Sequence, residues 1–160
     1  GGAIGVQNAR ITLQNSLVKA CRASGGGALF VQQSVQQRCY SAQPTVVTNV
    51  SVIGCTAMRG GAFDFRYAKP VAISEVFVLN NTAVQEGSAI YCKESSLDVK
   101  LLVVRHTCAR FVRAQQLPFV TKYHEKGSMP MSAAPIFSLL ESEIRLRAVS
   151  IVAMDECEDS

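Results

Sequence analysis

The chain has 160 residues, of which 48% are hydrophobic and 18% are charged, and its net charge is +4. This length fits one domain, and the apolar content excludes general disorder. No run approaches the roughly 18 uninterrupted apolar residues of a membrane-spanning helix, so we expect no membrane span in this segment. The basic residues do not alternate with aromatic ones, which argues against a nucleic-acid-binding surface.

Near-copies of one tetrapeptide, a glycine-led pair followed by Ala and a large apolar residue, recur along the chain. Their first residues lie 25, 34 and 27 positions apart, which is typical of repeat proteins whose units stack on one another. Glycine permits the positive φ and the close backbone approach of a tight corner. We therefore predict structural corners at Gly1, Gly2, Gly26, Gly27, Gly60, Gly61 and Gly87.

Between these blocks the chain alternates with the period of β-strands, as at Ile11 and Leu13 or at Val71 and Ile73. After each alternating segment comes a quartet that begins with an apolar residue and ends with a small or polar one. Stacked repeats would align the last residues of these quartets in a ladder, in which side-chain amides can bond to one another. The predicted ladder consists of Cys21, Cys55, Asn81 and His106.

A fifth, degraded repeat follows, with residues 134–137 in place of a glycine-led block and Ile144 and Leu146 in alternation. Residues 111–132 contain two prolines and do not alternate, so we expect a protruding loop insertion between the fourth and fifth repeats.

Each repeat holds only two or three short strands, which cannot bury a face alone, so neighbouring repeats must share a core. These requirements predict an all-β fold, a parallel β-helix of about five coils. Parallel crossovers are almost always right-handed, so we expect a right-handed β-helix. Because the first residues already lie in a repeat, we expect residues 1–160 to be a single β-helix fragment, truncated at both ends.

The glycine-led blocks, and above all residues 78–83 running into residues 87–91, resemble the repeats of polymorphic outer membrane proteins, best known from chlamydiae. Val stands where that family has Phe, and Cys or His replaces Asn at three of the four ladder positions, so the chain is similar to a divergent relative. The resemblance implies a non-catalytic structural or binding module of an adhesin-like protein. It would be secreted or at the cell surface, associated with the outer membrane if the source is bacterial, with a protein or glycan as its ligand.

The alternative is a pectin-lyase-like enzyme, which uses a β-helix to cleave acidic polysaccharide with paired carboxylates or a calcium-holding Asp group. Asp64 and Asp98 are 34 residues apart and neither has an acidic neighbour, so we predict no enzyme and no catalytic residue. Three or more carboxylates converging on adjacent coils would favour the enzyme. His106, Cys108, Cys92 and His124 make a poor zinc pattern, so we predict no metal site and no cofactor.

Cys21 and Cys55 share the ladder on adjacent coils, at a spacing that suits a disulfide, so a disulfide and two buried thiols both remain open. Two sequons allow glycosylation at Asn49 and Asn80 if the chain is secreted by a eukaryote. Open coils expose unpaired strand edges, so we expect the isolated chain to self-associate.

Overall fold

The computed structural model describes residues 1–34, 44–109 and 137–152, and these residues form strands and turns without a helix. The strands are β1 (Ile4–Gln7), β2 (Thr12–Lys19), β3 (Arg22–Gly25), β4 (Leu29–Gln32), β5 (Thr45–Ile53), β6 (Thr56–Arg59), β7 (Phe63–Arg66), β8 (Val71–Leu79), β9 (Thr82–Glu86), β10 (Ile90–Lys93), β11 (Ser96–Arg105), β12 (Cys108–Ala109), β13 (Phe137–Leu140) and β14 (Glu143–Val152). The predicted loop at 111–132 lies outside the described residues.

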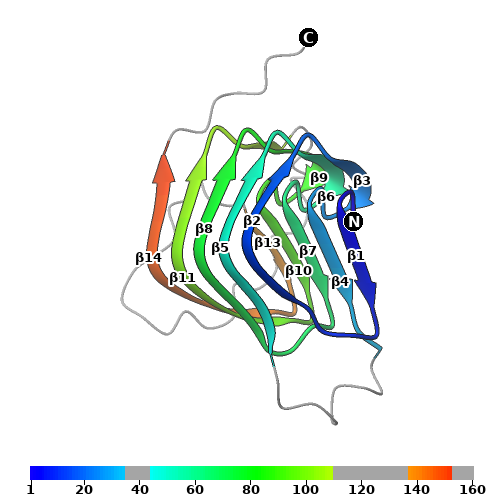
Figure 1. Ribbon diagram of the computed structural model, residues 1–160. Helices are drawn as coiled ribbons and strands as arrows, with labels where there is room; N and C mark the ends of the chain where they lie inside the picture. The colour runs from blue at the N-terminus through cyan, green and yellow to red at the C-terminus, as the bar shows by residue number, and fades with distance from the viewer. Residues whose placement is uncertain (35–43, 110–136, 153–160) are drawn as a thin grey trace.

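The strands form three parallel sheets (Figure 1). Sheet A has the order β1-β4-β7-β10-β13, sheet B the order β2-β5-β8-β11-β14, and sheet C the order β3-β6-β9-β12. Hydrogen-bonded neighbours are three strands apart in sequence, because each repeat contributes one strand to each sheet; the fifth contributes β13 and β14. The fold is therefore all-β with parallel sheets, as the sequence predicted.

The register aligns apolar residues of successive repeats, and these residues form the core. In sheet A, Leu29 pairs with Phe63, Phe63 with Ile90 and Ile90 with Phe137. Leu29, Phe63 and Ile90 are fully buried. In sheet B, Val52 pairs with Val78, and both are buried. Side chains of one repeat thus pack on those of the next, which is the shared core that short strands require.

A bend interrupts every long strand of sheet B at the same place in the register. The residue at the bend has a φ between 49° and 57° in all five strands, at Asn15, Asn49, Glu75, Leu101 and Ala148. One left-handed residue shifts the alternation by one position, so that residues 45 and 47 of β5 face the core before the bend, and residues 50 and 52 face it afterwards. Both halves of each strand therefore contact the core, and the long strands are visibly curved in Figure 1.

The first glycine of a corner allows the backbone to adopt a positive φ. Gly26, Gly60 and Gly87 have φ of 56°, 60° and 62°, in the left-handed region that residues with a Cβ rarely adopt. Each lies at the end of a sheet C strand or directly after it, where the chain turns into sheet A.

The second glycine of a corner allows close packing between repeats. A Cβ on Gly2 would overlap the carbonyl oxygen of Gly27, and one on Gly27 would overlap that of Gly61. Gly61 approaches the carbonyl oxygen of Ser88 in the same way. At the first corner, a Cβ on Gly1 would overlap the carbonyl oxygen of Ile4. The predicted corner glycines thus perform two different tasks.

In the part of the chain that the structure describes, there is no helix with the length and apolar character to cross a membrane.

Candidate binding site

Charged and aromatic side chains gather on the outward face of sheet A. Along each strand of this sheet, side chains alternate between the core and the outside, so that every second column of the register faces outward. One outward column consists of Gly5, Phe30, Asp64, Tyr91 and Ser138, and the other includes Gln7 and Arg66. We call the first of these the outer column of sheet A.

On this face, the buried Asp64 forms an ion pair with the half-buried Arg66. Arg66 donates from Nε to Oδ1 of Asp64 at 3.0 Å and from Nη2 to Oδ2 at 2.7 Å. Burial raises the pKa of Asp64, and the hydrogen bond and charge of Arg66 only partly oppose this effect. The hydrogen bond to Asp64 in turn raises the pKa of Arg66. Two-point pairing of this kind holds a guanidinium in a defined orientation.

The Arg66 guanidinium also contacts two aromatic rings. Its central carbon lies 5.2 Å from the Phe30 ring centroid and 5.6 Å from that of Tyr91. The guanidinium carbon of Arg59 lies 5.7 Å from the Tyr91 ring centroid, and Nε of Arg59 lies 4.0 Å from Oε2 of Glu86. The contacts of both arginines to the rings are within the range of cation–π attraction. The cluster contains two arginines and two carboxylates, and is therefore neutral when both acids are ionised.

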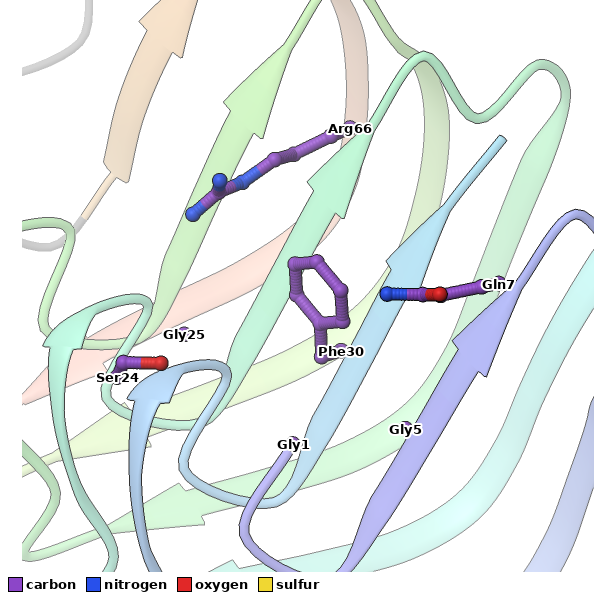
Figure 2. A pocket seen from close by; sticks show the side chains of 7 residues that line it. All are labelled: Gly1, Gly5, Gln7, Ser24, Gly25, Phe30 and Arg66. Carbon is purple, nitrogen blue, oxygen red and sulfur yellow. The ribbon is translucent and has the colours of Figure 1, made fainter. Parts of the chain in front are cut away.

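A pocket of about 430 Å³ opens beside this cluster (Figure 2). Its lining consists of Gly1, Gly5, Gln7, Ser24, Gly25, Phe30 and Arg66. Figure 2 shows the Phe30 ring between Arg66 and Gln7, with Ser24 across the pocket on β3.

Two glycines give the pocket its shape. A Cβ on Gly25 would lie 2.5 Å from Oδ2 of Asp64 and 3.3 Å from Nη2 of Arg66, so this position leaves room for the ion pair. A Cβ on Gly5 would meet only the backbone nitrogen of Gly1, at 3.6 Å, which is an ordinary contact. The space next to the Phe30 ring on the β1 side is therefore open because Gly5 has no side chain.

The ladder predicted after sheet B is present at Asn81, which is fully buried. Asn81 Oδ1 accepts the backbone N–H of Cys55 at 2.8 Å, and Nδ2 donates to the carbonyl oxygens of Val52 and Leu79 at 2.9 and 3.0 Å. Cys55 is at the equivalent position one repeat earlier, and its sulfur accepts the backbone N–H of Cys21 at 3.5 Å.

The prediction of His106 as a ladder residue is wrong by one position. His106 is exposed and has a φ of 47°, like Asn80 in the preceding repeat, so it occupies the turn. Arg105 pairs with Leu79 and Cys108 with Thr82, which aligns Thr107 with Asn81. Thr107 is buried, and its hydroxyl accepts a hydrogen bond from Ser88 at 3.2 Å. The fourth quartet therefore begins one residue later than its apolar pattern suggests, and a one-residue slip exchanges the two faces of a strand.

A second ladder, between sheets A and B, was not predicted. Ser95 and Ser142 are buried at equivalent positions, and each hydroxyl donates to the carbonyl oxygen two residues before it, at 2.9 and 2.8 Å. The Ser142 hydroxyl accepts the N–H of Ser95 at 3.0 Å, and the Ser95 hydroxyl accepts the N–H of Ala68 at 3.1 Å. The recurring Glu-Ser dipeptides at 94–95 and 141–142 were the sequence signal for it.

Cys21 and Cys55 are free thiols and not a disulfide. Each donates to the carbonyl oxygen two residues before it, at 3.3 and 3.7 Å, as the other ladder residues do. Burial raises the pKa of the Cys55 thiol, which disfavours the reactive thiolate at neutral pH.

Both sequon asparagines are exposed. Asn49 lies at the bend of β5 and donates from Nδ2 to Oδ1 of Asn15 at 2.7 Å, while Asn80 lies in the turn before the ladder. Exposure is compatible with modification at either position.

The structure does not bring Asp64 and Asp98 together. Asp64 faces outward from sheet A, whereas Asp98 is on sheet B, where Arg147 donates to it at 3.3 Å. Cys92, weighed as a metal ligand, points into the core, and burial raises its pKa well above the usual range. Within residues 1–34, 44–109 and 137–152, no three His, Cys, Asp or Glu side chains are grouped so that they could hold a metal ion.

The chain matches no family model, no curated protein and no solved structure. The resemblance to polymorphic outer membrane protein repeats therefore rests on the sequence motifs alone.

Proposed function

We propose that the repeats close into a right-handed parallel β-helix that serves as a non-catalytic binding module of a secreted or cell-surface protein. The observation that carries this proposal is the parallel pairing of each strand with its counterpart in the next repeat, in all three sheets. The pairing keeps one register throughout sheets A and B and shifts only at a bulge between β6 and β9 of sheet C. Parallel strands joined through the other sheets are almost always connected in a right-handed sense, which supports the handedness.

A β-helix of this kind displays side chains at regular intervals. Outward residues of successive repeats recur about every 4.8 Å along the axis, on a backbone that packed core residues and two buried ladders hold rigid. A ligand would therefore contact the outward-facing residues, since the inward-facing ones form the core. The outer column of sheet A has two aromatic rings, and Arg66 and Arg59 lie against them; aromatic residues and arginine are enriched in binding surfaces.

The enzyme alternative finds no specific support in the described part of the chain. Asp64 and Glu86 are the carboxylates near the outer column, and Arg66 and Arg59 are paired with them. Hence we propose that the module acts by binding, with a protein or a glycan as ligand.

At one end of the stack, β1, β2 and β3 are the edge strands of their sheets, and among the described residues each has a strand on one side only. We propose that the isolated chain self-associates through such edges, because unpaired backbone groups of a strand pair with another strand.

Labelling of intact cells tests the location. Antibodies raised against the 160-residue chain should label cells of the source organism, or their secreted matrix, without permeabilisation. Labelling that requires permeabilisation would refute the surface role.

The non-catalytic role is tested with polygalacturonate, for which neither new reducing ends nor the ultraviolet absorbance of unsaturated products should appear. Release of either product at a constant rate would establish an enzyme instead.

A further inference from the structure

We infer that the pocket between Phe30, Gln7 and Ser24 is a subsite for one ring of a neutral saccharide. The inference rests on the proposed binding function and names its ligand class and its place in the fold.

Phe30 provides the platform. Its ring is half-buried, and Arg66 covers part of it, with the guanidinium carbon 5.2 Å from the ring centroid. Towards β1 the register pairs Phe30 with Gly5, which has no side chain to cover the ring, and the Gln7 amide lies beside it. The face of an aromatic ring is electron-rich, and it attracts the weakly positive C–H groups on one face of a pyranose.

Polar groups for the saccharide hydroxyls surround this platform. Gln7 offers an amide that can donate and accept, and Ser24 offers a hydroxyl that can do both. Within the described residues neither side chain has a hydrogen-bond partner in the protein, and both are exposed. Such groups suit a ligand whose hydroxyls alternate between donor and acceptor roles.

The charges of the pocket favour a neutral ligand. The guanidinium of Arg66 has two nitrogens already bonded to Asp64. Gly1 also lines the pocket, and burial lowers the pKa of its α-amino group, which favours the uncharged form. An anionic ligand would compete with the buried carboxylate of Asp64, whereas a hydroxyl can approach the outer edge of the guanidinium without displacing it. The volume of about 430 Å³ is within the range of small-molecule pockets and is sufficient for a single sugar ring.

Saturation-transfer NMR on the 160-residue chain tests the inference, with the methyl glycosides of glucose, galactose, mannose and N-acetylglucosamine as probes and methyl galacturonate as the charged comparison. At least one neutral glycoside should receive saturation at the C–H protons of one ring face. Titration should give a dissociation constant at least about tenfold lower than that of the galacturonate, a difference of about 1.4 kcal/mol.

Three variants test whether the glycoside binds at this pocket. Phe30→Ala should weaken binding about tenfold, the ratio for a loss of about 1.4 kcal/mol. Gly5→Val should abolish binding without unfolding the chain, because its Cβ has room and valine favours a strand. Phe77→Ala is the matched control, since Phe77 is 52% exposed on sheet B, and it should bind as the parent chain does.

Unchanged binding in Gly5→Val, or equal losses in Phe30→Ala and Phe77→Ala, would refute the site. Tighter binding of methyl galacturonate would refute the neutral ligand class, and saturation of none of the glycosides would refute the saccharide. None of these results affects the proposed surface function, which fails separately if antibodies do not label intact cells.

Discussion

Replacing Asn81 with alanine should destabilise the fold more than any exposed substitution nearby. Asn81 is fully buried and makes three hydrogen bonds, one to the N–H of Cys55 and two to carbonyl oxygens. Alanine would leave the buried N–H of Cys55 without an acceptor and the carbonyl of Val52 without this donor. Each buried polar group left unpaired costs about 1–3 kcal/mol, so we expect a loss of about 3 kcal/mol in the free energy of unfolding.

Urea denaturation followed by far-ultraviolet circular dichroism measures this loss. The matched control is Asn80→Gly, because Asn80 is exposed with a φ of 53° and the same position in the preceding repeat holds Gly54, with a φ of 65°. Glycine adopts this conformation freely, so the control should change stability by no more than about 0.5 kcal/mol. A loss below about 1 kcal/mol for Asn81→Ala, or a loss equal to that of Asn80→Gly, would show that the ladder does not stabilise the stack.

Three further predictions concern the corners, the buried acid and the thiols. Gly27→Ala should prevent the repeats from stacking, with a loss of at least about 3 kcal/mol, because its Cβ would overlap the carbonyl oxygen of Gly61; wild-type stability in the same urea assay would contradict this. Burial raises the pKa of Asp64 above 3.8, so its contribution to stability is fully present below that pH and is lost as the pH rises through the raised value. Asp64→Asn should therefore remove part of the fall in urea midpoint above pH 3.8, and parallel pH profiles of the two proteins would refute the assignment. Cys21 and Cys55 should both react with iodoacetamide in denaturant without reductant, as detected by peptide mass spectrometry, and a linked peptide pair would overturn the thiol assignment.

The repeat architecture was predictable because its signals are local. The paired glycines mark corners that a Cβ would obstruct, and period-two alternation at Val71 and Ile73 marks strands that pack on one another. The bends of sheet B were not predictable from the residues that form them. Asn15 and Asn49 tolerate positive φ, but Leu101 and Ala148 do not favour it, so stacking imposes the conformation there.

The candidate binding site could not be predicted from the sequence, for a different reason. The segment Phe63-Asp64-Phe65-Arg66 is an ordinary alternating strand whose charged residues would be expected in solvent. Asp64 is nevertheless buried, because Arg66 covers it, Tyr91 lies beside it on the next strand and sheet C approaches through Gly25. Contacts of this kind join residues from different repeats and different sheets, and no spacing along the chain reports them.

The central claim is that five repeats stack in parallel, with one register along sheet B, and the distance between two spin labels tests it most directly. Gln14 and Arg147 are exposed on β2 and β14 and belong to one register column, with Thr48, Ser74 and Lys100 between them. A ketone-bearing amino acid at both positions allows nitroxides to be attached without labelling the cysteines. Four strand spacings predict a backbone separation of about 19 Å, seen as one narrow distance distribution in pulsed electron paramagnetic resonance. A broad distribution, or a separation above about 30 Å, would contradict the stack.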